Sequence, residues 1–237
     1  MGRSYHTIDS TSPPPPESPS VEDRRAAIAE LGEALRTLVE QAAASESPAD
    51  ELRRAAALVR EATIPVGKQQ RTRGQIPSAD DLLGGVRMHN PVCGDGSAIA
   101  PPLRVEVVEG KAVGTCTLGL VYEGPPMYAH GGISALLLDQ ILGYATSVAG
   151  HPGMTVRLDT QYRAPVPLRT PLRLAAEVVG VDGRKVTARA TITTESEPDA
   201  VLVEATGLFV ALRSDQSERL FGEALHPDAS NPAAAHD

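Results

Sequence analysis

The segment that most constrains the fold runs from Tyr122 to Ala149, where a turn rich in Gly and Pro leads into an almost wholly apolar helix. One acidic residue, Asp139, interrupts this helix. The neighbours of Asp139 leave no continuous polar stripe, so we expect the helix to be buried on most sides rather than to lie on a surface. An unpaired buried carboxylate is costly, and burial is a usual way for a protein to make a base that works near neutral pH.

On both sides of this helix, apolar and polar residues alternate as they do in strands, and short turns join the later runs. One helix among five or more such strands predicts an α+β fold in which an antiparallel sheet wraps around a central helix. Aromatic residues make up only 3% of the chain, so this core must consist mainly of Val, Leu, Ile and Ala. The alternating runs are 103–108, 113–119, 154–161, 172–179, 186–192 and 201–212, with turns at 109–110 and 181–183.

The rest of the chain divides by composition. Ser20 and Asp23 form a capping box that starts one helix, and Pro65 is expected to close a second. These helices bury too little to stand alone, so we expect them to pack on the following domain or on a partner subunit. The expected divisions are a disordered tail rich in Pro and Ser (1–19), a helical N-terminal extension (20–62), a linker (63–96), the domain of sheet and helix (97–212) and a disordered C-terminal tail (213–237).

Composition excludes several classes of protein. The chain has 22 Lys and Arg against 30 Asp and Glu, a net charge of -8, and no long basic stripe, so nucleic acid is not an expected partner. No apolar run has the length of a signal peptide or a membrane span, so we expect no membrane association and a cytoplasmic location. Cys93 and Cys116 are too few for a disulfide framework and are expected to be reduced. No metal-binding cluster or nucleotide loop is recognisable.

The start of the apolar helix is a candidate oxyanion hole. Gly131 and Gly132 lie where the first helical amides have no partner within the helix, and glycine lets a substrate oxygen approach the backbone closely. Alternatively, these glycines only permit a tight turn and close packing of the helix on the sheet. His130, directly before them, could orient a substrate or donate a hydrogen bond to it, or could satisfy a buried backbone carbonyl.

Asp139 is the candidate base or nucleophile, and the alternative is a carboxylate that reaches solvent or pairs with a structural Arg. Gly131 and Asp139 are eight residues apart, which is about 12 Å along a helix axis. They cannot both touch one carbonyl carbon within a single chain. If both act on one bond, two antiparallel copies of the helix must lie side by side, and the protein must act as a dimer with two equivalent sites.

With these features assembled, residues 88–212 resemble the PaaI-type hotdog-fold thioesterases, which hydrolyse acyl-coenzyme A. The HGG sequence followed at this spacing by an acid on an apolar helix is the most specific part of the resemblance. The pieces that carry it are Asn90, Pro91 and Gly94 at the beginning, YEGPP at 122–126, HGG at 130–132, Asp139, and the strand MTVRLDTQYRAPVP at 154–167.

The resemblance implies roles for individual residues. It makes Asp139 the general base or nucleophile and the Gly131 amide the oxyanion donor, with His130 assisting. A hydroxyl residue that orients the attacking water falls on Thr155. Regular alternation would turn Thr155 away from the face of Met154, so contact with Asp139 requires an irregular strand start or an approach across an interface.

The resemblance also implies an acyl-CoA substrate, active sites between the subunits of a homodimer or homotetramer, and no cofactor apart from the coenzyme A of the substrate. Some family members have an Asn six positions before the histidine, where this chain has Gly124. Gly132 and the cations Arg163, Arg184 and Lys185 are the expected substrate-binding residues, the cations for the phosphates of coenzyme A.

Two other functions remain open at this stage. The first is a hotdog hydratase or dehydratase that acts on enoyl thioesters, although the loop typical of that branch is absent. The second is a non-catalytic acyl-CoA sensor whose helical extension recruits a partner.

Overall fold

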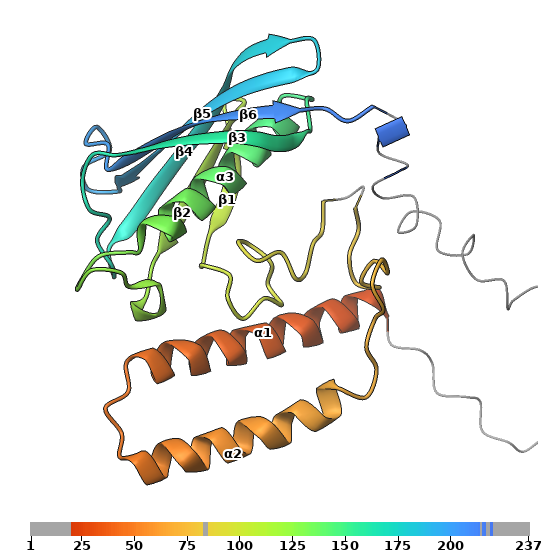
Figure 1. Cartoon of the computed structure of the whole chain (residues 1–237), viewed down its shortest axis with the longest axis vertical. Coiled ribbons are helices and arrows are strands. Elements are labelled where there is room, and N and C mark those ends of the chain that lie inside the picture. The colour runs from red at the N-terminus through yellow and green to blue at the C-terminus, as the bar shows by residue number, and fades with distance from the viewer. Residues whose placement is uncertain (1–19, 83–84, 214, 217–218, 220–237) are drawn as a thin grey trace, which may run out of the picture.

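Six strands form one antiparallel sheet that curves around helix α3 (Gly131–Val148) (Figure 1). The computed structural model describes residues 20–82, 85–213, 215–216 and 219. The strand order is β1-β2-β4-β5-β6-β3, so β1 and β3 form the two edges. The strands are β1 (Arg104–Val108), β2 (Lys111–Thr117), β3 (Met154–Tyr162), β4 (Pro171–Asp182), β5 (Lys185–Thr194) and β6 (Val203–Val210). The predicted fold of a sheet wrapped around a central helix is confirmed.

A row of alanines crosses the middle of the sheet beneath α3. Ala112, Ala176, Ala190 and Ala205 stand opposite one another on β2, β4, β5 and β6, and each is at most 2% exposed. Because these side chains are single methyl groups, the helix backbone can come close to the sheet. The space is filled from the helix side by large aliphatic residues that are fully buried, namely Leu137, Leu138, Ile141 and Leu142.

Both predicted turns join neighbouring strands. Glu109 and Gly110 connect β1 to β2 with φ values of 52° and 77°, which is the left-handed pair that a two-residue hairpin requires. Gly183, with φ of 56°, connects β4 to β5. Short hairpins of this kind impose the antiparallel pairing of the strands that they join.

Among the described residues, strand β3 is an edge strand that pairs only with β6. Its side chains Met154, Val156 and Tyr162 are 47%, 57% and 55% exposed. An open edge with large apolar side chains is a surface that a further strand can cover.

Helix α1 (Val21–Ala43) begins at the predicted N-cap, where the Ser20 hydroxyl accepts the Asp23 amide at 3.1 Å. Side chains of α1 hold the helix to the domain through hydrogen bonds with backbone groups. Arg36 donates to the carbonyl oxygens of Asp95 and Ser97 at 2.6 and 2.9 Å. We call α1 and the following helix, residues 49–66, the arm; of the two, α1 contacts the domain.

Glu40 makes a further polar contact between α1 and the domain. Its carboxylate accepts the amides of Leu120 and Val121 at 2.9 and 3.1 Å, at the start of the short helix η1 (Leu120–Tyr122). A carboxylate at the amino end of a helix satisfies donors that have no partner within the helix. The same contact places α1 next to the turn that precedes α3.

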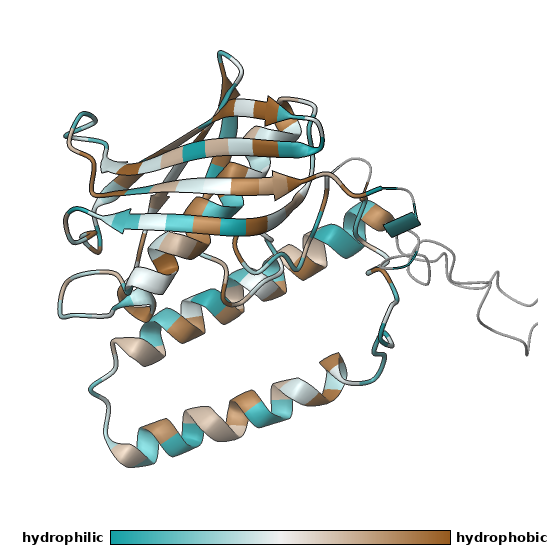
Figure 2. Ribbon diagram, turned by 45° about the horizontal axis from the view of Figure 1, so that its top comes forward, coloured by the Kyte–Doolittle hydropathy of each residue, from teal (hydrophilic) through white to brown (hydrophobic). Residues whose placement is uncertain are grey.

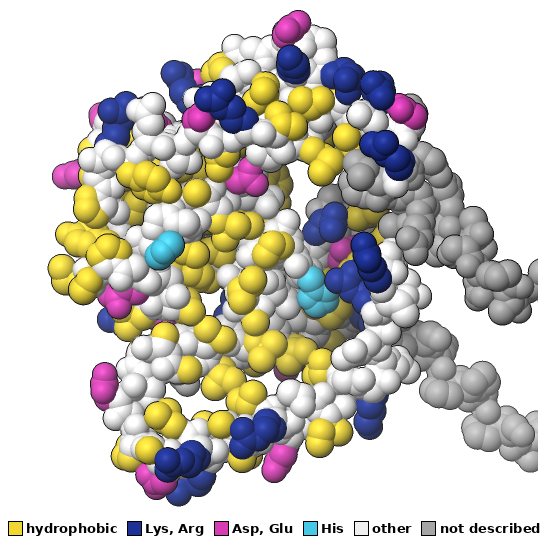
Figure 3. All heavy atoms as spheres, viewed as in Figure 1, with side chains coloured by type: hydrophobic (Ala, Val, Ile, Leu, Met, Phe, Trp, Pro, Cys, Tyr) yellow, Lys and Arg dark blue, Asp and Glu magenta, His cyan; other side chains and the backbone are white. Residues whose placement is uncertain are grey.

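Helix α2 (Ala49–Val66) has no buried residue. Leu52, Val59 and Val66 recur along one side of it and are 46%, 40% and 57% exposed. Figure 2 shows hydrophobic and hydrophilic residues mixed along α2, and Figure 3 shows hydrophobic side chains over both helices of the arm. Of the two helices expected to pack, α1 packs on the domain, whereas α2 buries no side chain in this chain.

Two details differ from expectation or lie outside the described residues. Helix α2 does not end before Pro65 but one residue after it, at Val66, so the proline lies in the last turn. The segment 63–96 also supplies the buried side chains Ala79, Met88 and Val92.

The tails expected to be disordered, 1–19 and 213–237, fall outside the description except for residues 213, 215–216 and 219. No helix among the described residues is both long and apolar enough to cross a membrane.

Gly32 brings α1 close to the domain. A Cβ added there would overlap the Asp95 carbonyl oxygen and the Gly96 backbone, neither of which is a movable side-chain end. We therefore expect Gly32→Ala to lower the free energy of unfolding by about 2 kcal/mol, measured by urea denaturation. The matched control is Gly143→Ala in α3, where an added Cβ meets no atom within 4 Å. That control should gain about 1 kcal/mol from helix propensity. Equal effects of the two substitutions would contradict the close approach at Gly32.

Cys116 on β2 makes stability depend on alkaline pH. Burial raises the pKa of this thiol to about 12, above its value in the unfolded chain. Below the unfolded pKa the thiol is protonated in both states. Above it the unfolded chain releases a proton that the folded chain keeps, so stability falls by about 1.4 kcal/mol per pH unit beyond about pH 9. Urea denaturation at about pH 8 and pH 10 should show a smaller loss for Cys116→Ala than for the wild type; identical losses would contradict this assignment.

Candidate active site

Asp139 lies at the margin of the buried face of α3, beside the first residues of β3. Its Oδ1 atom accepts a hydrogen bond of 2.9 Å from the Thr155 hydroxyl. The expectation that Asp139 is buried on most sides is wrong, because the carboxylate is only half-buried. The physical reason is the edge position of β3, which leaves the helix side that faces this edge uncovered in the single chain.

A β-bulge turns Thr155 toward Asp139. The pairing of β3 with β6 shifts between Thr155 and Arg157, so that Val156 is an extra residue in the strand. A bulge reverses the alternation of side chains on its far side. Thr155 therefore shares the helix-facing side with Leu158, which the regular pattern does not predict. This is the irregular strand start that the sequence required for contact between Thr155 and Asp139.

His130 is the N-cap of α3. Its Nδ1 atom accepts the Gly132 amide at 3.0 Å, so the imidazole caps the helix rather than satisfying a buried carbonyl. A neutral imidazole whose Nδ1 accepts a hydrogen bond carries its proton on Nε2. The Nε2–H group is then a donor that points away from the cap. The Gly132 amide, expected to bind substrate, is already occupied by this contact.

The Gly131 amide differs from that of Gly132. Within the described part of the chain, no acceptor is in hydrogen-bond contact with the Gly131 N–H. It is the first amide of the helix, where the dipole of the helix favours negative charge. An oxygen that gains negative charge during a reaction would be stabilised at this position.

Tyr162, which the sequence analysis did not select, holds this helix end against β3. Its hydroxyl donates to the Gly131 carbonyl oxygen at 2.9 Å. The tyrosine ring lies 3.4 Å from the position of a Cβ on Gly131, which is ordinary van der Waals contact. The alternation that includes Leu158 and Thr160 would have placed Tyr162 on the helix-facing side if it had been extended to residue 162.

The three expected cations lie at opposite ends of β3. Arg163 follows the end of β3, where it pairs with Glu204 at 2.5 Å and lines a hollow of about 370 Å³ with Gly131 and Tyr162. Arg184 donates to the Ala211 carbonyl at 2.9 Å in the turn between β4 and β5, and Lys185 begins β5. Lys185 stands opposite Val210, which in turn pairs with Met154 at the start of β3. Arg184 and Lys185 are therefore at the Thr155 end of the sheet.

A single chain does not bring all candidates together. Asp139 and Thr155 form one group near the start of β3, and Gly131 with Tyr162 forms the other near its end. Eight residues of helix separate Gly131 from Asp139, about 12 Å along the axis. One chain thus holds the candidate base at one end of this helix side and the candidate oxyanion donor at the other.

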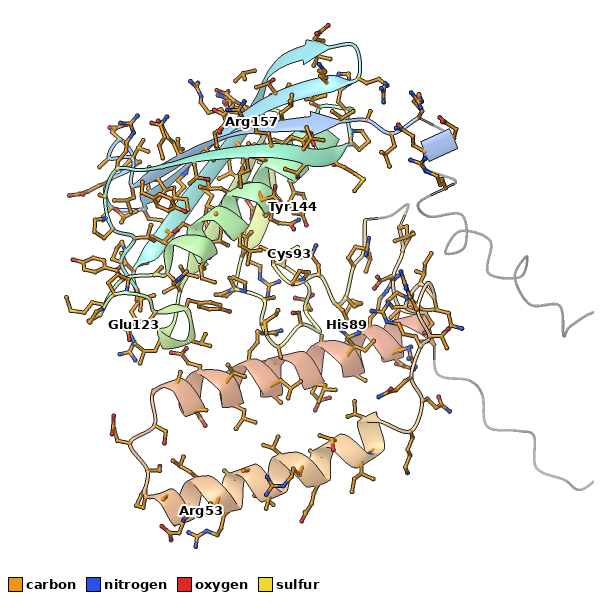
Figure 4. All side chains as sticks on the ribbon, viewed as in Figure 1. Arg53, His89, Cys93, Glu123, Tyr144 and Arg157 are labelled. Carbon is orange, nitrogen blue, oxygen red and sulfur yellow. The ribbon has the colours of Figure 1, made fainter. Side chains whose placement is uncertain are left out.

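A cleft of about 510 Å³ lies next to Asp139, between α3 and the loop of residues 85–95. In it the Cys93 thiol and the Tyr144 hydroxyl meet at 3.6 Å (Figure 4). Burial raises the pKa of Tyr144 to about 12 and also raises the pKa of Cys93, so both groups are protonated at neutral pH. The sequence did not predict this cleft, because it depends on how a loop packs on α3. Among residues 20–82 and 85–213, no three His, Cys, Asp or Glu side chains gather as metal ligands.

Comparisons with known proteins identify the family to which the domain is similar. A family model described as thioesterase superfamily matches residues 128–201. Acyl-coenzyme A thioesterase THEM4 of Xenopus laevis is 35% identical over 95 residues, which cover 40% of this chain and 42% of that protein. The protein of the same name from Mus musculus is 30% identical over 105 residues, covering 44% and 45%. The chain therefore spans less than half the length of these curated relatives.

A solved crystal structure of a thioesterase superfamily protein extends the match beyond the family model. It is 36% identical and has a TM-score of 0.67, and the match covers 77% of this chain and 94% of that one. The resemblance expected from the HGG sequence and Asp139 is confirmed.

Proposed function

Because the chain belongs to the thioesterase superfamily, we propose that it hydrolyses the thioester bond of an acyl-coenzyme A to a free acid and coenzyme A. The observation that carries this proposal is the hydrogen bond from Thr155 to Asp139, which holds a half-buried carboxylate beside a hydroxyl. The curated relatives in frog and mouse are named as acyl-coenzyme A thioesterases, which supports the choice of substrate.

In the proposed reaction, Asp139 acts as a general base. Thr155 orients one carboxylate oxygen and a water molecule. Asp139 takes a proton from that water while the water oxygen attacks the thioester carbon. The new C–O bond leaves negative charge on the former carbonyl oxygen, which the Gly131 amide and the His130 Nε2–H stabilise. The C–S bond then breaks, and the thiolate of coenzyme A takes the proton from Asp139.

The separation of about 12 Å between Gly131 and Asp139 along α3 supports a site whose two halves come from different chains. A twofold axis beside the open edge of β3 would place the Asp139 end of one protomer against the Gly131 end of the other. An axis near the middle of β3 would bring Thr155 close to Tyr162 of the partner subunit. The homodimer, alone or within a homotetramer, would then carry two equivalent sites and cover the exposed apolar side chains of this edge.

The same symmetry explains the positions of the cations. Arg163 of one protomer and Arg184 with Lys185 of the other would flank one site, although they lie at opposite ends of a single chain. Arg163 already pairs with Glu204, so Arg184 and Lys185 are the stronger candidates for the phosphates of coenzyme A.

Removal of the carboxylate tests the base. We expect Asp139→Ala to lower kcat/KM for acyl-CoA hydrolysis by about 100- to 10,000-fold, measured by thiol release, because no other described acid lies beside Thr155. The matched control is Glu106→Ala, which removes an exposed acid on β1 at the opposite edge of the sheet and should leave the rate unchanged. Near wild-type activity of Asp139→Ala in a folded protein would reject the assignment.

Gly131→Pro tests the oxyanion donor and the shared site together. Proline at the first helical position removes only the N–H, and His130, with φ of -60° and ψ of 135°, is already in a conformation that precedes proline. We expect about a 100- to 1,000-fold loss of kcat for this variant alone. In mixed dimers of Gly131→Pro with Asp139→Ala, one of the two sites is intact.

Activity should therefore return when the two inactive variants are refolded together. Random pairing makes about half of the dimers mixed, so about a quarter of the wild-type activity is expected. The control is each variant refolded alone, which should stay inactive. No recovery in the mixture would show that Gly131 and Asp139 do not act across two chains.

A further inference from the structure

Gly143 lies within α3 at a position where the structure provides no packing reason for a glycine. A glycine in a helix interior destabilises it by about 1 kcal/mol relative to alanine. At Gly32 a close backbone contact explains the glycine. At Gly143, by contrast, an added Cβ meets no atom within 4 Å among the described residues. The space beside Gly143 is open, and a larger side chain at this position would enter it.

That space is the cleft between α3 and the loop of residues 85–95. Gly143 lines it together with Gln140 and Tyr144 from the same face of the helix. Asp139 and Thr155 do not line the cleft themselves, but Asp139 is four residues before Gly143 on the same side of α3, and the lining residue Gly153 is two positions before Thr155. Its volume of about 510 Å³ is within the range of small-ligand pockets.

The hydrogen bonds in the cleft fix the direction of a side-chain amide. The Asn90 Oδ1 atom accepts the amides of Val92 and Cys93 at 2.8 and 3.2 Å, which identifies the Asn90 nitrogen as the donor to Gln140. The Gln140 Oε1 atom accepts that nitrogen at 3.3 Å. The Gln140 Nε2 atom must therefore be the group without a partner among the described residues, and it is a donor.

We propose that this cleft holds the acyl group of the substrate, that Gly143 keeps it open, and that the acyl group is short to medium in length and carries a hydroxyl or carbonyl oxygen. This inference rests on the proposed thioester hydrolysis. The oxygen of the acyl group accepts a hydrogen bond from the Gln140 amide. The Tyr144 hydroxyl, which is protonated at neutral pH, makes a second polar contact with the acyl group. A long alkyl chain is excluded, because it would cover these polar groups without replacing their hydrogen bonds to water.

Filling the space tests the location. We expect Gly143→Leu to lower kcat/KM by about 100-fold for butyryl- and 3-hydroxybutyryl-coenzyme A but by less than about threefold for acetyl-coenzyme A, whose acyl group ends before the filled region. The matched control is Gly180→Leu on β4, because an added Cβ there also meets nothing within 4 Å and the residue does not line the cleft. If Gly143→Leu does not fold, Gly143→Ala, which is expected to be more stable than the wild type, replaces it. Its kcat/KM should also fall more for the two larger acyl groups than for acetyl-coenzyme A, by smaller factors.

Removing the donor tests the substrate class. The wild type should prefer 3-hydroxybutyryl- to butyryl-coenzyme A, and Gln140→Met should reduce this preference by about tenfold, the equivalent of one hydrogen bond. Equal losses for acetyl and larger acyl groups in the Gly143 variants, or an unchanged preference in Gln140→Met, would overturn the inference while hydrolysis itself stands. A wild type that hydrolyses no thioester would remove the proposed function and this inference with it.

Discussion

Helix α3 lies on a row of four alanines, and the rest of the domain is arranged around that close approach. With larger side chains in the row of Ala112, Ala176, Ala190 and Ala205, the helix would stand further from the sheet. Asp139 reaches Thr155, and Gly131 reaches Tyr162, only because the helix and β3 are held at this short separation. The core packing and the candidate chemistry therefore depend on the same contact between helix and sheet.

Much of the domain follows from local patterns. Apolar runs and alternation were enough to predict the central helix, the strands and the two hairpin turns, and the HGG sequence with Asp139 pointed to the family. The contact between Thr155 and Asp139 was predicted with its condition, an irregular strand start, and the bulge at Val156 meets that condition. These features could be predicted because each depends on residues close in sequence or on one helix and one strand.

Other features could not be predicted from periodicity. The strand order, which makes β3 an edge, results from packing between distant segments. The half-buried state of Asp139 follows from that edge, so the expected degree of burial was wrong. Tyr162 was missed because the alternating run was ended at residue 161, one residue before it. The space at Gly143 is invisible in the sequence, since a helical glycine that permits close packing and one that leaves room look the same.

The loop of residues 85–95 is held from two sides, by α3 through Asn90 and Gln140 and by α1 through Arg36 and the Asp95 carbonyl. Its position is thus determined partly by a helix that precedes the sheet by some sixty residues. A chimaera that transplants only the sheet and α3 into a relative would leave one wall of the cleft behind. Modular exchange within this family must therefore carry α1 along with the domain.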